Sequence, residues 1–430
     1  MSQEQAQAAA PPAAQGAVFA VTVLTLMNLL NYLDRWVPAA VKDLFKQDLD
    51  LSDAETSLPF TAFVIVYMLA SPIFGGLADR APRRLLIALG VALWSLATAA
   101  AALATGFWSL FFARALVGVG EAAYATIAPS LIADFYPPAR RNRILTIFYV
   151  AIPVGSALGF TLGGVVGARW GWQAAFLVAG LPGLLAAGGA LLIREPVRGA
   201  FEDPEARQAQ PPRWPEALRL MFSSRLYVCA VAGYTLVTFA TGGMADWFAV
   251  FLSRRHGLSV AEAGSAIGTV TVVGGLLGTA LGGLLADRLR GWTRQPYLAL
   301  SGFSMLVATV AAGVALLAPD ARSCVTWILI AQFFLWFYNG PINALIANAV
   351  PAAIMARAFS VSILAIHLLG DAISPPIIGA VSDATGSLPL ALKIVPTTLG
   401  IGAVIWLWGW FTIPEVERAP GEKAAAPPVH

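Results

Sequence analysis

Seven ionisable side chains lie within long apolar runs of the chain, and their types suit proton transfer or the binding of a charged ligand. They are Asp34, Arg35, Arg114, Glu121, Asp246, His367 and Asp371. A charge held in a membrane interior costs at least about 2.5–3.5 kcal/mol, so each one needs a partner or a water-filled cavity. Arg114 and Glu121 are seven residues apart, two turns of a helix, and therefore share one face. We expect that face to look into a central cavity.

The other three residues are less closely constrained. His367 and Asp371 are four residues apart, so they share a helix face and can pair. Asp246 lies near the end of its apolar run, where water can reach it.

The composition places these residues in an all-α membrane protein. Of the 430 residues 58% are hydrophobic and 12% are charged, with a mean hydropathy of +0.72, which is unusual for a soluble domain. A helix needs about 20 apolar residues to cross a bilayer. Runs broken by Gly, Pro or charge clusters predict twelve crossings, at 17–40, 57–79, 84–105, 107–135, 142–168, 172–194, 225–252, 263–287, 295–318, 323–349, 357–383 and 388–413.

The crossings fall into two groups of six. The predicted order is a disordered tail at 1–16, a bundle at 17–194, a Pro-rich linker at 195–224, a bundle at 225–413 and a tail at 414–430. Eighteen Lys and Arg residues fall on the side of the tails and linker and seven on the other. The positive-inside rule therefore predicts that both termini are cytoplasmic. The Ala, Gly and Arg content points to a bacterial inner membrane.

A short motif occurs at the ends of the second and eighth crossings. Gly75–Arg80 (Gly-Gly-Leu-Ala-Asp-Arg) recurs in the second half as Gly283–Arg288 (Gly-Leu-Leu-Ala-Asp-Arg). The glycines permit close helix packing, and the Asp and Arg can pair with a neighbouring helix end. With two arginines behind it, the first copy resembles the loop signature of the major facilitator superfamily, although Pro82 stands where a Gly is usual.

This resemblance implies a fold of two pseudo-symmetric six-helix bundles. It also implies that the motif gates and packs helices and does not contact substrate. The predicted cytoplasmic gate, in which Asp134 pairs with a nearby arginine, consists of Asp79, Arg80, Arg83, Asp134, Asp287 and Arg288.

Four further stretches, spread over both halves, resemble the Spinster family of lysolipid and sphingosine-phosphate transporters. They are Asn31–Arg35 (Asn-Tyr-Leu-Asp-Arg), Arg114–Ala122 with Ala128–Ser130, Gly233–Phe239, and His367–Asp371 (His-Leu-Leu-Gly-Asp) with Ser374–Pro375. The Asn-Tyr-Leu-Asp-Arg string and the Gly-Glu pair of the second stretch also occur in organic-anion symporters of the same superfamily. The third and fourth, and above all the His-Leu-Leu-Gly-Asp stretch, favour the Spinster family.

In the superfamily fold the first and fourth crossings line one side of the central cavity. The resemblance therefore implies that Asp34, Arg35, Arg114 and Glu121 meet. From their chemistry we expect Asp34 and Glu121 to be proton-coupling sites and Arg35 and Arg114 to bind a substrate headgroup. Protonation of an acid would release an arginine for an anion. The alternative is a buried salt-bridge network that only holds two helices together, although buried pairs are weak stabilisers.

The second half offers neutral groups among Phe, Leu and Trp, which suit an acyl chain or a ring. The predicted lining of the substrate cavity is Tyr234, Thr238, Trp336, Asn339 and Asn343. Singly, each of the aromatic residues also fits ordinary helix packing. For His367 and Asp371, a structural role and a coupling role both stay open.

The sequence lacks the motifs that mark several other classes of function. We find no phosphate loop, dinucleotide fingerprint, metal-binding spacing or nucleophile elbow, so we expect no enzyme, cofactor or metal. The net charge of +3 suggests no nucleic acid. The prediction is a monomeric, proton-linked transporter of a small amphipathic or anionic substrate, a lysophospholipid or sphingosine-1-phosphate-like lipid, by alternating access. The alternatives are a proton symporter for a water-soluble carboxylate and a membrane sensor with a transporter fold.

Overall fold

The computed structural model describes residues 15–78, 80–198, 213–289, 293, 295–351 and 354–414. The first half contains α2 (Ala17–Ala40), α3 (Lys42–Asp48), α4 (Asp53–Ala78), α5 (Arg83–Ala101), α6 (Phe107–Phe135) and α7 (Pro138–Leu191). The second half contains α8 (Trp214–Ser223), α9 (Arg225–His256), α10 (Val260–Leu289), α11 (Pro296–Leu317), α12 (Ala321–Leu335), η1 (Trp336–Tyr338), α13 (Asn339–Asn348), α14 (Met355–Ile366), η3 (His367–Asp371), α15 (Ser374–Thr385), α16 (Leu388–Ala391) and α17 (Ile394–Thr412). Most of both predicted tails, and the middle of the linker, lie outside the described residues.

The predicted architecture of twelve crossings is confirmed. Eleven helical stretches are long and apolar enough to span a membrane, and the one within α7 crosses twice because Gly171 bends it with a φ of 85°. Two crossings of the second half are segmented. The tenth consists of α12, η1 and α13, and the eleventh of α14, the π-helical η3 and α15. The short helices α3 and α8 and these two interruptions are absent from the sequence-based prediction.

Glycines bring α7 close to α2. A Cβ added at Gly155 would lie 2.5 Å from the carbonyl oxygen of Leu29, and one at Gly159 would lie 2.4 Å from that of Leu33. Only glycine fits such a close backbone approach, so these glycines of the fifth crossing serve helix packing. This packing fixes α2, which carries two of the buried charges.

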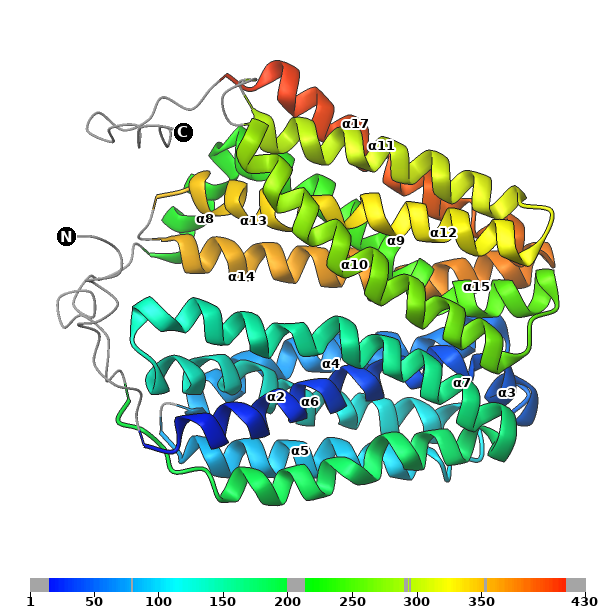
Figure 1. The fold of residues 1–430 in the computed structure, drawn as a ribbon, viewed down its shortest axis with the longest axis horizontal. Coiled ribbons are helices and arrows are strands. Elements are labelled where there is room, and N and C mark those ends of the chain that lie inside the picture. Colours follow the sequence, from blue (N-terminus) through cyan, green and yellow to red (C-terminus); the bar gives the residue numbers. More distant parts are fainter. Residues whose placement is uncertain are drawn as a thin grey trace, which may run out of the picture.

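The two bundles meet on one side of the molecule. We call the side where α2 begins and α17 ends the linker side, and the opposite side the far side. In Figure 1 the bundle of α2–α7 lies below the bundle of α9–α17, and the ribbons converge at the right, around α3 and the start of α10, and diverge towards the left, where both termini are marked. Helix α7 packs on α10, and α4 packs on α15.

Both inter-bundle crossings depend on glycine. Gly264 of α10 faces the carbonyl oxygen of Phe160, and Gly379 of α15 faces the backbone of Asp53. Within the first bundle, next to these crossings, the aromatic ring of Trp36 stacks between Phe60 and Phe160, with centroid separations of 5.9 and 5.6 Å. The far side is therefore closed by direct helix contact.

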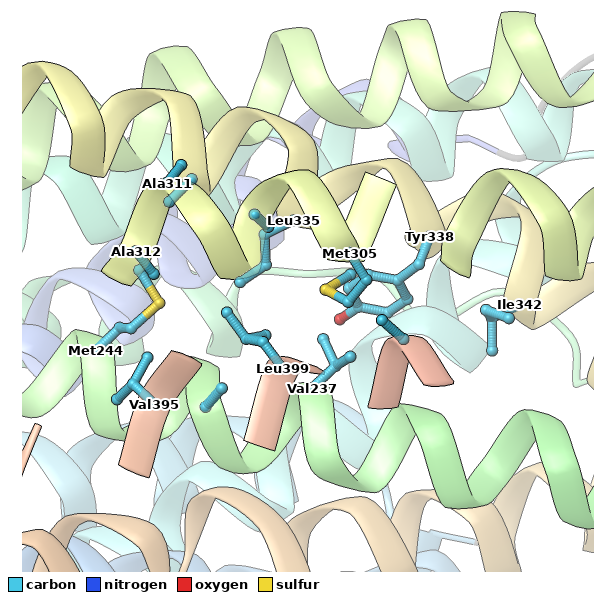
Figure 2. Packing of buried hydrophobic residues seen from close by; sticks show 14 of the residues in the cluster. Val237, Met244, Met305, Ala311, Ala312, Leu335, Tyr338, Ile342, Val395 and Leu399 are labelled. Atoms are coloured by element: carbon cyan, nitrogen blue, oxygen red, sulfur yellow. The ribbon is translucent and has the colours of Figure 1, made fainter. Parts of the chain in front are cut away.

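The second bundle has a packed apolar interior. Figure 2 shows Val237 and Met244 of α9 facing Leu399 and Val395 of α17, with Met305 beside the ring of Tyr338. These side chains are at most 5% exposed. The interior of this bundle is therefore filled by apolar side chains of α9, α11 and α17.

A substitution at the α7–α10 crossing tests whether closure of the far side matters. We expect Gly264→Ala to reduce the transport rate at least about fivefold, since its Cβ would lie 2.4 Å from the Phe160 carbonyl oxygen and core overpacking costs about 1–3 kcal/mol. Gly313→Ala in α11 is the control, because a Cβ there meets nothing within 4 Å. Equal rates for both variants in reconstituted vesicles would contradict a requirement for this contact.

Candidate functional site

The two acids and two bases of the first and fourth crossings form two ion pairs between α2 and α6. The Nη2 atom of Arg35 lies 2.6 Å from Oε2 of Glu121, and Nη1 of Arg114 lies 3.1 Å from Oδ1 of Asp34. Thr98 of α5 donates a 2.5 Å hydrogen bond to the second oxygen of Asp34. Each helix supplies one acid and one base, and we call these four residues the charge quartet.

Aromatic rings surround the guanidinium of Arg35. Its central carbon lies 4.6 Å from the ring centroid of Tyr32, 5.0 Å from that of Phe63 and 5.6 Å from that of Tyr67. Ring faces attract cations and so hold this guanidinium in place. The Arg35 side chain is 16% exposed, whereas that of its partner Glu121 is fully buried. Arg35 is therefore the part of this pair that a ligand can reach.

The pairing of the quartet leaves some hydrogen-bonding capacity unused. The Oε1 atom of Glu121 and the Nε atom of Arg35 are buried and have no hydrogen-bond partner among the described residues. Buried polar atoms without partners are uncommon in proteins and mark positions where a proton or a ligand can add a bond. The Arg35–Glu121 pair is thus less completely satisfied than Asp34, whose two oxygens both have donors.

A narrow cavity of about 20 Å³, room for about one water molecule, lies between the quartet and the far side. Its charged lining consists of Arg35, Arg114, Lys42 and Asp246, and most of the remaining lining is apolar or aromatic, including Phe45, Phe60 and Phe176. We call this space the far-side cavity. Three of its charged groups come from the first bundle, and Asp246 comes from the second.

Lys42 and Asp246 form a buried ion pair between the bundles. Ser57 of α4 completes it, because its hydroxyl accepts a 2.8 Å hydrogen bond from Lys42 and donates one of 2.7 Å to Asp246. Asp246 is only 5% exposed, so the expectation that water reaches it is wrong; Lys42 and Ser57 of the first bundle cover this part of α9. Burial lowers the pKa of the Lys42 ammonium, and the Asp246 carboxylate opposes that shift.

A second set of ion pairs closes the rim of the far side. Arg254 of α9 contacts Asp43 at 2.6 Å and Asp53 at 2.8 Å, and Lys46 lies 2.5 Å from Asp53. Asp383 of α15 accepts a 2.9 Å hydrogen bond from the backbone N–H of Asp53, at the first turn of α4 where a negative charge is stabilising. These contacts join α3 and α4 to α9 and α15, and we call them the far-side gate.

Sequence reasoning missed both sets of inter-bundle ion pairs. One signal was present: Lys42 follows the first crossing, and Asp246 lies near the end of the seventh. In a pseudo-symmetric fold these are equivalent places in the two halves, so opposite charges there can meet. Nothing in the local sequence, however, states that the far side is closed.

The predicted lining of the substrate cavity lies on α9, η1 and α13. These residues are Tyr234, Thr238, Trp336, Asn339 and Asn343. The ring of Tyr234 lies edge-on to Tyr338 at 5.1 Å and contacts the side chain of Asn343. The Thr238 hydroxyl donates to the carbonyl of Tyr234 at 2.9 Å, which leaves mainly its methyl group for other contacts. All five side chains are neutral.

Trp336 is placed differently from the others. Its indole N–H donates a 3.0 Å hydrogen bond to Gln332 one turn away, and a Cβ added at Gly275 of α10 would lie 3.6 Å from its ring. The ring thus packs between helices of its own bundle. Helix packing is the simpler interpretation of this residue.

His367 and Asp371 meet in η3, where Nδ1 of His367 lies 3.0 Å from the Asp371 carboxylate. At Gly370 the backbone leaves helical geometry, with φ −108° and ψ −106°. Next to this break, Thr61 of the first bundle donates a 2.5 Å hydrogen bond to the carbonyl of Ala372. The pair therefore lies beside an inter-bundle contact, which is compatible with both a structural and a coupling role.

The predicted gate residues lie on the linker side. Arg83 contacts Asp134 at 2.7 Å within the first bundle, while Arg80 and Arg288 are exposed. Asp79 and the side chain of Asp287 lie outside the described residues. The gate role of these six residues stays a prediction.

Buried charge is concentrated in the first bundle. Among the described residues, seven charged side chains of the first half are buried, Asp34, Lys42, Asp53, Arg83, Arg114, Glu121 and Asp134. Within the same described part of the chain, only Asp246 belongs to the second half. The two halves share an architecture but differ in chemistry.

Comparisons with known proteins agree with this architecture. The chain matches the sequence profile of the Major Facilitator Superfamily over residues 24–375. Protein spinster homolog 1 of Homo sapiens is 35% identical over 396 residues, which cover 84% of this chain and 72% of the human protein. Protein spinster of Drosophila melanogaster is 35% identical over 381 residues, which cover 85% of this chain and 62% of the fly protein.

Solved structures show the same fold. A bacterial homolog to human lysosomal transporter, Spinster, in an inward-facing and unoccupied conformation, superposes with a TM-score of 0.78 at 25% identity, covering 92% of this chain and 96% of that chain. A D-xylose-proton symporter superposes with a TM-score of 0.75 at 18% identity, covering 93% and 98%. Two pseudo-symmetric bundles of this kind define a multi-pass membrane transporter. The chain belongs to the Spinster family of the major facilitator superfamily.

Proposed function

We propose that the protein is a proton-linked secondary transporter of an amphipathic anionic lipid, such as a lysophospholipid or a sphingosine-1-phosphate-like molecule. The observation that carries this proposal is the charge quartet, in which each guanidinium is held by one buried carboxylate. A carboxylate that takes up a proton loses its charge and releases its guanidinium. A free guanidinium can make two parallel hydrogen bonds to a phosphate or carboxylate of the substrate.

We expect the Glu121–Arg35 pair to be the first to take up a proton and to bind the anion. Arg35 is the more accessible guanidinium, and Glu121 retains an oxygen without a partner among the described residues. Protonation of Glu121 would leave the Arg35 guanidinium over the rings of Tyr32, Phe63 and Tyr67, already positioned for an anion. Arg114 and Asp34 are more deeply buried and would bind or release charge in a later step.

The second bundle suits the apolar part of such a substrate. Tyr234 contacts Tyr338, whose ring belongs to the apolar interior of Figure 2, and Thr238 and Asn343 lie beside Tyr234. Among the described residues, Asp246 is the one buried charge of this half. Apolar walls with few polar groups are typical of sites for large apolar ligands. An acyl chain or ring would therefore lie against α9 and α13 while the headgroup lies at the quartet.

The orientation in the membrane decides which side the closed far side faces. With the linker side in the cytoplasm of a bacterium, as the distribution of basic residues indicates, closure of the far side corresponds to a state open to the cytoplasm. Rocking of one bundle against the other would then expose the quartet alternately to the two sides. We take the monomer as the working unit.

Uptake into proteoliposomes with an imposed pH gradient tests the proposal. We expect Glu121→Gln and Asp34→Asn to lower the stimulation of lysolipid transport by the gradient at least about tenfold, since a tenfold change corresponds to about 1.4 kcal/mol of lost coupling. Glu262→Gln is the control, because Glu262 lies outside the quartet at the far-side end of α10. Unchanged proton-driven transport in both quartet variants would refute the coupling role.

The same assay separates the alternatives. Competition by lysolipids but not by short carboxylates would support the lipid substrate, and the reverse would favour a symporter for a water-soluble organic acid. A purified protein that binds lysolipid and never translocates it would favour a membrane sensor.

A further inference from the structure

The far-side cavity contains a ready-made binding site for an oxyanion, built by the first bundle alone. The ammonium of Lys42 and the hydroxyl of Ser57 converge on one oxygen, Oδ2 of Asp246. Lys42 and Ser57 are 1% and 0% exposed. Both donors belong to the first bundle, whereas the oxygen that they bind belongs to the second. In this respect Lys42 differs from the quartet arginines, each of which is paired with an acid of its own bundle.

Opening of the far side must separate these groups. Asp246 moves with the second bundle, and so does Trp247, whose ring lies 3.9 Å from the Lys42 ammonium. The charges that remain close to Lys42 on its own bundle are Asp43 and Asp53. Asp53 keeps Lys46 as its partner, and Asp43 points to the rim, where it contacts Arg254.

We propose that Asp246 is a tethered anion that plugs an oxyanion site of Lys42 and Ser57, and that the substrate headgroup takes its place when the far side opens. The proposal rests on the proposed function, in which the headgroup is anionic. Lys42, Arg35 and Arg114 line one continuous cavity, so the headgroup moves between Lys42 and the quartet without leaving a positively charged wall. The site recognises a phosphate or carboxylate group and discriminates against cations.

The proposal has a consequence for gating. A headgroup bound at Lys42 and Ser57 occupies the position of the Asp246 carboxylate, so the far side cannot close until the headgroup has moved on. Closure is then tied to transfer of the anion towards Arg35 and Arg114. The alternative is a latch, an ion pair between Lys42 and Asp246 that holds the far side closed and binds no substrate. A latch would not require the anion to move before the far side closes.

Two variants that break the same ion pair distinguish a plug from a latch. In a latch, Lys42→Gln and Asp246→Asn act alike, because each removes one half of the pair. In a plug, Asp246→Asn leaves the cationic site open to an external anion, whereas Lys42→Gln removes the site. The probe is a cysteine at Ala39, which lines the same cavity, reacted with an uncharged methanethiosulfonate reagent in the presence and absence of inorganic phosphate. The native cysteines, Cys229 and Cys324, are buried.

We expect phosphate at about ten times its dissociation constant to slow the reaction of Ala39→Cys at least about tenfold with Asp246→Asn, because the bound anion occupies the cavity. It should have no effect with Lys42→Gln, which lacks the site. Lys42→Arg together with Asp246→Asn should keep the protection, since a guanidinium also binds phosphate. A cysteine at Thr105, an exposed far-side position outside the cavity, is the matched control and should show no protection in either variant.

An equal effect of phosphate at Ala39→Cys in the two variants would overturn the plug and leave a latch. If Lys42→Gln does not fold, the comparison is between Ala39→Cys and Thr105→Cys in the Asp246→Asn protein, and an equal effect of phosphate there overturns the proposal as well. These rates need no transported substrate. Failure of lysolipid transport and failure of the plug are therefore separate results.

Discussion

Replacing Arg114 by Ala is expected to abolish transport and to lower the free energy of unfolding by about 3–5 kcal/mol, because Asp34 then remains as a buried charge without its cation. Asp34 lies between α2, α5 and α6, and its other hydrogen-bond donor is the hydroxyl of Thr98. One hydroxyl does not compensate a buried carboxylate. Thermal unfolding in detergent and uptake into vesicles measure the two effects.

The double variant Asp34→Asn with Arg114→Leu separates a transport role from a structural one. Replacing both members of a buried pair by neutral groups is often harmless to stability, and Thr98 can still donate to the side-chain carbonyl of the new asparagine. We expect the double variant to regain most of the lost stability and none of the transport. Recovery of transport together with stability would mean that the quartet only holds helices together.

Replacing Arg254 by Ala is expected to shift the protein towards a state that is open at the far side. Arg254 bridges Asp43 and Asp53 across the bundle interface with five hydrogen bonds of 2.6–3.2 Å. Charge-assisted hydrogen bonds contribute about 1.5–3 kcal/mol each when buried and less when partly exposed, as here, so we expect at least about a tenfold rise in the open population.

Distances between spin labels measure that population. Labels at Thr105 of the first bundle and Ala384 of the second occupy exposed far-side positions. Arg255→Ala is the matched control, because Arg255 is exposed and the structure records no ion pair for it among the described residues. The same distance distribution in both variants would show that the Arg254 contacts do not hold the far side closed.

The crossings and the quartet could be predicted from the sequence because each depends on a local or strongly constrained signal. Long apolar runs mark the crossings, and a charge inside such a run needs a partner. The spacing of Arg114 and Glu121 placed both on one face, and the family resemblance brought α2 and α6 together. Which acid holds which base was not predictable, since that depends on the rotation of both helices about their axes.

The closed far side could not be predicted for a different reason. Under the proposed alternating access, contacts such as Lys42 with Asp246 form in one state of the transport cycle and break in another, so no single sequence pattern requires them. The interruptions at η1 and η3 were also missed. Trp336 and Leu368 belong to apolar runs that read as continuous helix, and the π-helical turn depends on packing of Gly370 against α9.

The interruptions at η1 and η3 make the second half of the molecule easier to bend than the first. The tenth and eleventh crossings are segmented, whereas their counterparts in the first half, α6 and the first part of α7, run without a break. The ion pairs of the quartet require rigid neighbours, because hydrogen bonds weaken steeply when their atoms are displaced. A segmented helix bends at low cost and adjusts to guests of different shape. Under the proposed function, we therefore expect the protein to accept lipid chains of different length and to be strict about the headgroup.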